Sequence, residues 1–266
     1  MINTTLLKRE IKANYILLLI FIFVLTLYAV IIVAMFDPEL GSSLKLMAES
    51  MPQLFAAVGM LNVGTTLVEF VVGYLYGILL VAFPAVFIII FSNRLIAKYV
   101  DQGAMAYLLA TPNKRWKIAV TQAVALIAGI FCLILYVSVL IMCTGQAMFP
   151  GELDVPAFLR VNIGLFGLLL FFGGICYCSS CIFNDAKLCN GVGAGVIIGS
   201  ILIQMISRVG EKIENLKYAT PLTLFNTDGL IAGETMAYIQ CAVLYAAGLI
   251  LIAVGIAVFC KKDLSV

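Results

Sequence analysis

The sequence predicts an all-α protein that crosses a membrane six times. Hydrophobic residues make up 64% of the 266 residues and charged residues only 11%, against about a quarter charged in an ordinary soluble domain. Six apolar stretches are long enough to span a bilayer, and none contains a charged residue. Backbone groups in lipid must pair within the protein, and the short alternating segments of a barrel are missing, so we expect helices.

The six predicted spans cover residues 15–36, 70–93, 118–143, 161–183, 188–207 and 235–260. The first, as a helix of 22 residues, rises about 33 Å, enough for a hydrocarbon core of about 30 Å. Its length and the absence of a small-residue cleavage site favour an uncleaved span over a signal peptide. We therefore treat residues 1–266 as a single transmembrane domain.

The charges of the connecting segments predict the orientation. If both termini face the cytoplasm, the inner segments hold 11 of the 16 Lys and Arg but only 4 of the 14 Asp and Glu. This asymmetry predicts cytoplasmic N- and C-termini. The net charge of +2 gives no reason to expect nucleic acid as a partner.

The first 14 residues predict an interfacial helix. In "LLKREIKAN" the apolar Leu6, Leu7 and Ile11 fall on one side, while Lys8 and Lys12 fall elsewhere. This pattern is typical of a helix on the inner membrane surface, although simple anchoring by positive charges explains it as well.

Two outer segments lack a spanning pattern. Within residues 37–69, the apolar stretch 52–63 is too short to span, so we expect an interfacial or re-entrant piece. In residues 208–234, Pro221, Asp228 and Gly229 predict turns rather than one continuous helix.

Residues 101–117, "DQGAMAYLLATPNKRWK", read as a short soluble helix between spans two and three. Met105, Leu108 and Leu109 share one face. Pro112 ends the helix, because the residue before proline avoids helical geometry. A basic turn follows with Lys114, Arg115 and Lys117. We expect either a docking element for a cytoplasmic partner or a positive loop whose helix lies on lipid.

The sequence also limits the energy source. Ion-coupled carriers usually place ionisable residues inside the membrane, but the spans have none and the chain has no histidine. The G-x-x-x-x-G-K-[ST] nucleotide loop is missing too. If nucleotide powers the protein, another chain binds it. A sodium site built from carbonyls and hydroxyls stays open, and we expect no enzymatic activity of the chain itself.

Small and polar residues in the spans predict helix packing. Gly191, Gly195 and Gly199 form a strip that lets another helix approach closely, either from this chain or from a second copy. Long polar side chains in or near the spans predict interhelical hydrogen bonds or, less often, a substrate path. These are Gln122, Asn162, Gln204 and Gln240.

A cysteine cluster raises the question of a metal. Cys176, Cys178, Cys181 and Cys189 lie near one end of spans four and five. Cysteine also packs as a small apolar residue, and a C-x-x-C pair outside its structural context is a weak metal signal. We therefore expect no metal on this chain.

The segment "SNRLIAKYVDQGAMAYLLATPNKRWKI" resembles the segment between the second and third spans of ABC exporter permeases of the type 2 class. The N-terminal "LLKREIKAN" resembles the connecting helix of that family, and "FCKKDLSV" resembles its usual ending. The resemblance implies a permease dimer, of identical or related subunits, paired with two cytoplasmic ATP-binding subunits. ATP and Mg²⁺ would lie on those partners, and this chain would carry no cofactor.

The resemblance also implies roles for particular residues. Residues 94–117 would form a cytoplasmic coupling segment whose short helix contacts the ATPase. Its positions here are Asp101, Gly103, Met105, Leu108, Leu109, Pro112 and Arg115. Spans two and five would line the path, with Tyr74, Phe83, Ser200 and Gln204 as candidates.

We expect a multi-pass protein of a cell membrane, that of a bacterium. Uncharged walls favour hydrophobic or amphipathic cargo. The alternatives are a membrane anchor or regulatory subunit that moves nothing, and a carrier driven by an ion gradient.

Overall fold

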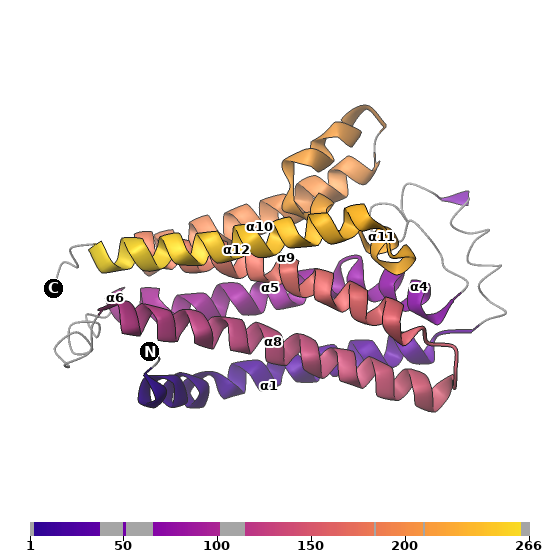
Figure 1. The fold of residues 1–266 in the computed structure, drawn as a ribbon, viewed down its shortest axis with the longest axis horizontal. Coiled ribbons are helices and arrows are strands. Elements are labelled where there is room, and N and C mark those ends of the chain that lie inside the picture. The colour runs from indigo at the N-terminus through magenta and orange to yellow at the C-terminus, as the bar shows by residue number, and fades with distance from the viewer. Residues whose placement is uncertain are drawn as a thin grey trace.

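The computed structural model is shown in Figure 1 and describes residues 3–37, 50–51, 66–101, 115–183, 185–209 and 211–261. Within these residues every regular element is a helix. Six helices are long and apolar enough to cross a membrane, and each overlaps one predicted span. The all-α prediction with six membrane-spanning helices is therefore confirmed.

The first span is part of a longer helix, α1 (Thr4–Ala34). Its N-cap residue is Asn3, whose side-chain oxygen accepts hydrogen bonds from the backbone N–H groups of Thr5 and Leu6. Residues 4–14, which belong to the segment that we expected to form an interfacial helix, are the first turns of α1. Its buried face recurs every third or fourth residue along the whole length, a helical period that faces one neighbour. This face packs mainly on α8 (Arg115–Met148).

The second span is interrupted several times. It consists of α4 (Leu67–Val71), the π-helix η1 (Val72–Tyr76), α5 (Leu79–Ser92), the π-helix η2 (Asn93–Ala97) and α6 (Lys98–Asp101). Ile78, between η1 and α5, departs from helical geometry with φ −135°, and Pro84 lies inside α5. Proline removes a helix hydrogen bond, and π-turns distort the regular ladder. This span is therefore less regular than the other five.

The remaining spans are α8, α9 (Val155–Ile182), α10 (Ala186–Val209) and α12 (Thr235–Lys261). The last outer segment forms three short helices instead of one, as expected. They are η3 (Glu211–Ala219), η4 (Pro221–Leu224) and α11 (Thr227–Ala232). The left-handed Gly233, with φ 76°, ends α11. Residues 52–63, expected as a re-entrant piece, lie outside the described residues.

Helix α9 is the centre of the bundle. It packs on α5, α8, α10, α11 and α12, and its apolar window is the most buried of the six spans. Its closest neighbour is α12, and glycines permit this approach. A Cβ added at Gly174 would lie 2.8 Å from the Gly248 carbonyl oxygen, and one added at Gly255 would lie 3.2 Å from Cys178 Cα.

Both ends of the described chain lie at one end of the bundle (left in Figure 1), together with the end of α6 and the start of α8. The α9–α10 connection lies there too. The described Lys and Arg residues at this end are Lys8, Arg9, Lys12, Arg94, Lys98, Arg115, Lys117, Lys187 and Lys261. The described acids there are Glu10, Asp101 and Asp185. We call it the basic end.

Candidate functional site

Most of the predicted coupling residues fall between α6 and α8. Asp101 is the last residue of α6 and Arg115 the first of α8. Gly103, Met105, Leu108, Leu109 and Pro112 lie outside the described residues. The described structure therefore shows how the chain enters and leaves residues 102–114, and which side chains fix those two points.

A buried carboxyl joins the two points to the N-terminal helix. Glu10 of α1 is only 1% exposed. Its Oε1 atom accepts a hydrogen bond from the Tyr99 hydroxyl of α6, at 2.9 Å, and one from Gln122 Nε2 of α8, at 3.3 Å. The Arg9 guanidinium lies over the Tyr99 ring, 5.9 Å from its centroid. We call Glu10, Tyr99 and Gln122 the Glu10 cluster.

Further bonds hold the start of α8 in place. The backbone N–H of Asn3 donates to Thr121 Oγ1 at 3.0 Å. The hydroxyl of Tyr177, on the central helix α9, donates to the Ala119 carbonyl at 2.7 Å. The first turns of α8 are thus bonded both to the beginning of α1 and to the centre of the bundle.

Sequence reasoning identified Gln122 as a polar residue of interest but missed its partners. Glu10 and Tyr99 lie far from it along the chain, and only the rotation of three helices brings them together. One signal was available. The helical period places Glu10 on the same face as Leu6 and Leu17, and all three are buried in α1.

The four candidate path residues have separate packing partners. Half-buried Tyr74 stacks on Phe70 with ring centroids 4.5 Å apart, and Phe83 lies 5.7 Å from Tyr28 of α1. Ser200 donates to the Val196 carbonyl within its own helix. Gln204 connects to the outer helices, as described next. Each of the four thus has a packing or hydrogen-bond partner outside the set.

Gln204 tethers the outer segment to α10. Its Oε1 atom accepts from the Thr220 hydroxyl at 2.6 Å and from Thr223 at 3.4 Å. Gln204 is 8% exposed and Thr220 is 4% exposed, so these bonds are shielded from solvent. The bond to Thr220 fixes where η3 ends and η4 begins.

A second polar cluster lies inside the bundle near the start of α9, away from the basic end. The Asn162 carbonyl oxygen Oδ1 accepts from the Tyr76 hydroxyl and from the Ser138 hydroxyl, both at 2.7 Å. Asn162 Nδ2 donates to the Phe158 carbonyl at 2.8 Å. The expected interhelical role of Asn162 is therefore confirmed, and its partners tie η1 and α8 to α9.

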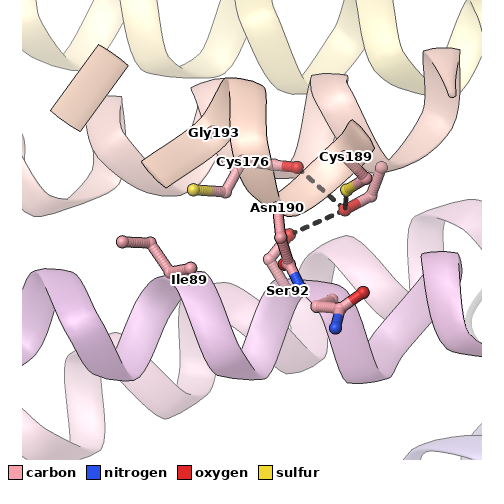
Figure 2. Close-up of a pocket in the computed structure, with 8 residues that line it drawn as sticks. Ile89, Ser92, Cys176, Cys189, Asn190 and Gly193 are labelled. Atoms are coloured by element: carbon pink, nitrogen blue, oxygen red, sulfur yellow. Dashed lines mark hydrogen bonds between the residues drawn. The ribbon is translucent and has the colours of Figure 1, made fainter. Parts of the chain in front are cut away.

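Two residues of the cysteine cluster, Cys176 and Cys189, line a small pocket between α5, η2, α9 and α10, shown in Figure 2. Ser180 bonds the Cys176 carbonyl at 2.9 Å, and its hydroxyl lies 3.0 Å from the Cys189 sulfur. The Cys176 sulfur points away from Cys189 in Figure 2. Among the described residues no three His, Cys, Asp or Glu side chains gather closely enough to hold a metal.

The predicted glycine strip faces away from the rest of the described chain. A Cβ added at Gly191, Gly195 or Gly199 meets no described atom within 4 Å. By contrast, a Cβ added at Gly193 would lie 3.1 Å from the Cys176 sulfur. Of the two partners left open by the sequence, a helix of this chain does not occupy the strip within the described residues.

No protein-family model matches the chain, and no curated protein matches it.

Proposed function

We propose that this chain is the membrane-spanning permease subunit of an ABC exporter, driven by ATP-binding subunits on separate chains. The observation that carries the proposal is the frame around residues 102–114. The helix that enters them and the helix that leaves them are both bonded to α1 through Glu10. A force applied to these residues from outside the membrane would therefore reach α1, α6 and α8 together.

The residue pattern supports the same proposal. The segment that resembles a coupling element follows the end of α6 and precedes the start of α8, and both of these points lie at the basic end, which the positive-inside rule assigns to the cytoplasm. ATP-binding subunits would have to dock on that face. The chain has no nucleotide loop of its own, so its energy would come through this contact.

The glycine strip supports a second permease subunit. Gly191 and Gly195 are exposed on α10 among apolar side chains such as Val192 and Val196, which are 40% and 46% exposed. Small residues on a lipid-facing helix allow close helix approach. We propose that α10 of a second copy, or of a related permease, packs on this strip.

We propose that hydrophobic or amphipathic cargo passes along spans two and five. Tyr74 and Phe83 on span two and Ser200 and Gln204 on span five would line its route. In this scheme Gln204 acts through its bond to Thr220, which holds the outer helices over the end of α10.

The test is a co-purification with the ATP-binding protein encoded beside the gene. The full chain and that protein are expressed together, purified through a tag on this chain, and assayed for ATP hydrolysis. Replacing Leu108 and Leu109 together by Asp removes an apolar docking face. We expect at least about a tenfold loss of affinity, which corresponds to about 1.4 kcal/mol.

The matched control is Leu216→Asp, because Leu216 is 40% exposed on η3, at the opposite end of α10 from the basic end. We expect the control to keep the complex and its ATP hydrolysis. An unchanged complex with unchanged hydrolysis in the double variant would contradict the proposed coupling role.

The same material distinguishes the alternatives. A membrane anchor would hold the ATP-binding protein but move no solute into inverted vesicles at any ATP concentration. An ion-driven carrier would move solute without nucleotide, and Glu10 would give it a buried ionisable group. Solute movement that requires ATP and follows the Leu108 and Leu109 substitutions supports the exporter.

A further inference from the structure

The Glu10 cluster contains a buried acceptor that has no partner among the described residues. Gln122 is 0% exposed, and its Oε1 atom is buried without a hydrogen bond, while its Nε2 atom donates to Glu10. Buried polar atoms in proteins almost always have a partner. An orphaned carbonyl oxygen beside a buried carboxyl is therefore a sign that a donor joins this cluster in another state.

The charged surroundings of the carboxyl are sparse. Among the described residues, the charged or titratable groups that act on Glu10 are Arg9 on its own helix and Tyr99 on α6. The neighbouring α8 presents the uncharged Gln122. Arg9 is exposed and lies over the Tyr99 ring. The ionised carboxylate is thus stabilised chiefly by two hydrogen bonds, which is little for a buried charge.

We propose that Glu10 is a proton-binding site and that its protonation controls the contact between α1, α6 and α8 beside residues 102–114. The proton comes from water and binds one carboxylate oxygen; no other bond forms or breaks. The neutral carboxylic acid has an O–H donor that the carboxylate lacks. When the Gln122 amide turns over, this O–H donates to the Oε1 atom, which has no described partner in the ionised arrangement, and this bond replaces the one that Nε2 donated to Glu10.

The direction of the effect follows from the environment. Glu10 lies in the polar first turns of α1, ahead of the apolar stretch that begins at residue 15. Burial raises the pKa of Glu10 above its usual range, and the hydrogen bonds from Tyr99 and Gln122 and the charge of Arg9 oppose this only in part. The folded protein therefore holds the proton more tightly than the unfolded chain does.

The sign of the pH dependence is then opposite to that of a salt-bridged carboxylate. A raised folded pKa means that protonation stabilises the fold as the pH falls through that pKa. The stabilisation is lost as the pH rises above it. The cluster is expected to be tight when Glu10 is neutral and looser when it is ionised.

Trp116 offers a fluorescent reporter at the start of α8, the helix that carries Gln122. It is the only tryptophan of the chain, lies one residue after the start of α8, and is 42% exposed. A change in how α8 packs on α1 and α6 should alter its emission. The full chain, purified in detergent micelles, is titrated from about pH 8 to about pH 5 while Trp116 emission and the unfolding temperature are recorded.

The comparison is between wild type and Glu10→Gln, which keeps a hydrogen-bonding group of similar size but cannot ionise. We expect the Trp116 emission of the wild type to titrate and that of Glu10→Gln to lack this transition. We expect the two unfolding temperatures to converge at low pH, with the wild type lower at high pH. The exposed Glu152→Gln should titrate like the wild type.

A second variant keeps the test informative if Glu10→Gln folds poorly. Tyr99→Phe removes a donor that favours the ionised carboxylate. It should move the midpoint of the Trp116 transition to higher pH, because the charged form loses support. A wild-type emission that is flat with pH overturns the proposal. So does a midpoint that Tyr99→Phe leaves unchanged or moves to lower pH.

Discussion

Asn162 illustrates how single polar residues connect the spans. Its Oδ1 atom accepts from Tyr76 and Ser138, which belong to two other elements. Ser138 also donates to the Ile134 carbonyl, so it keeps a partner without Asn162. Tyr76 is 1% exposed, and among the described residues its hydroxyl bonds only to Asn162. Loss of Asn162 therefore mainly removes the hydrogen-bond acceptor of the Tyr76 hydroxyl.

We expect Asn162→Ala to lower the free energy of unfolding by about 0.6–2 kcal/mol, because it strands the buried Tyr76 hydroxyl. Thermal unfolding of the purified chain in detergent measures this. Gln240→Ala is the matched control, since the buried Gln240 Oε1 atom has no hydrogen-bond partner among the described residues. Equal losses in the two variants would contradict the assigned role of Asn162.

At this scale the sequence predicted which side chains matter better than it predicted their partners. Asn162 and Gln122 were identified because a long polar side chain in an apolar helix needs a hydrogen bond. Their partners depend on how far each helix is rotated about its axis. That rotation is set by packing with distant parts of the chain, so Tyr76 and Glu10 could not be assigned as partners from the sequence.

At the scale of elements, the tightest crossing is that of α9 with α12. A Cβ at Gly248 would lie 3.0 Å from the backbone nitrogen of Phe171. Because the atom in the way belongs to the backbone, it cannot move aside as a flexible side chain would. The two helices have to separate to accept a larger residue.

We expect Gly248→Ala to destabilise the chain by lowering its unfolding temperature, although alanine favours helix over glycine by about 1 kcal/mol. The control is Gly195→Ala, where no described atom lies within 4 Å of the added Cβ. That variant should unfold at the wild-type temperature or above it. A Gly248→Ala protein as stable as Gly195→Ala would contradict the close crossing.

A larger residue in the glycine strip tests the proposed permease pair. Gly195→Leu should leave the single chain folded but weaken association of two copies, because the helices could no longer approach closely. Crosslinking and light scattering in detergent measure the oligomer. A wild-type chain that stays monomeric, or a dimer unaffected by Gly195→Leu, would contradict this contact.

The glycines also show why the sequence could not decide between partners. Gly191, Gly195 and Gly199 have the four-residue spacing typical of close helix pairs, yet this chain packs nothing on them in the described residues. Gly248 and Gly255 are seven residues apart, so they share a face of α12, and the close pair with α9 is built on that face. Spacing reveals a smooth face but not which helix covers it.

Span two shows a similar limit. Its apolar composition predicted a membrane helix, and residues Leu79–Val100 are long and apolar enough to cross a membrane. Gly77 and Pro84 were available as signals of irregularity, but the two π-helices were not predicted. A π-turn accommodates one extra residue in the helix, and its position depends on tertiary packing. Tyr76 in η1 and Leu95 in η2 are both buried in the core.

For the whole molecule, composition and hydropathy were sufficient to predict the class. Six uncharged stretches predicted six spanning helices, because a backbone in lipid must pair its polar groups within the protein and a helix does this within one segment. The charges of the connecting segments predicted both termini on one side, and both ends of the described chain lie at one end of the bundle in Figure 1. The arrangement of the spans around α9 could not be predicted, since all six are similarly apolar.

The central claim is that the basic end faces the cytoplasm, where a separate ATP-binding partner can act on it. Labelling of native lysines with a membrane-impermeant amine reagent, read by mass spectrometry of peptides, tests it most directly. Lys187 lies at the basic end and Lys217 on η3 at the opposite end. We expect Lys217 to be labelled in intact cells and Lys187 only in inverted vesicles. Labelling of Lys187 in intact cells would contradict the account.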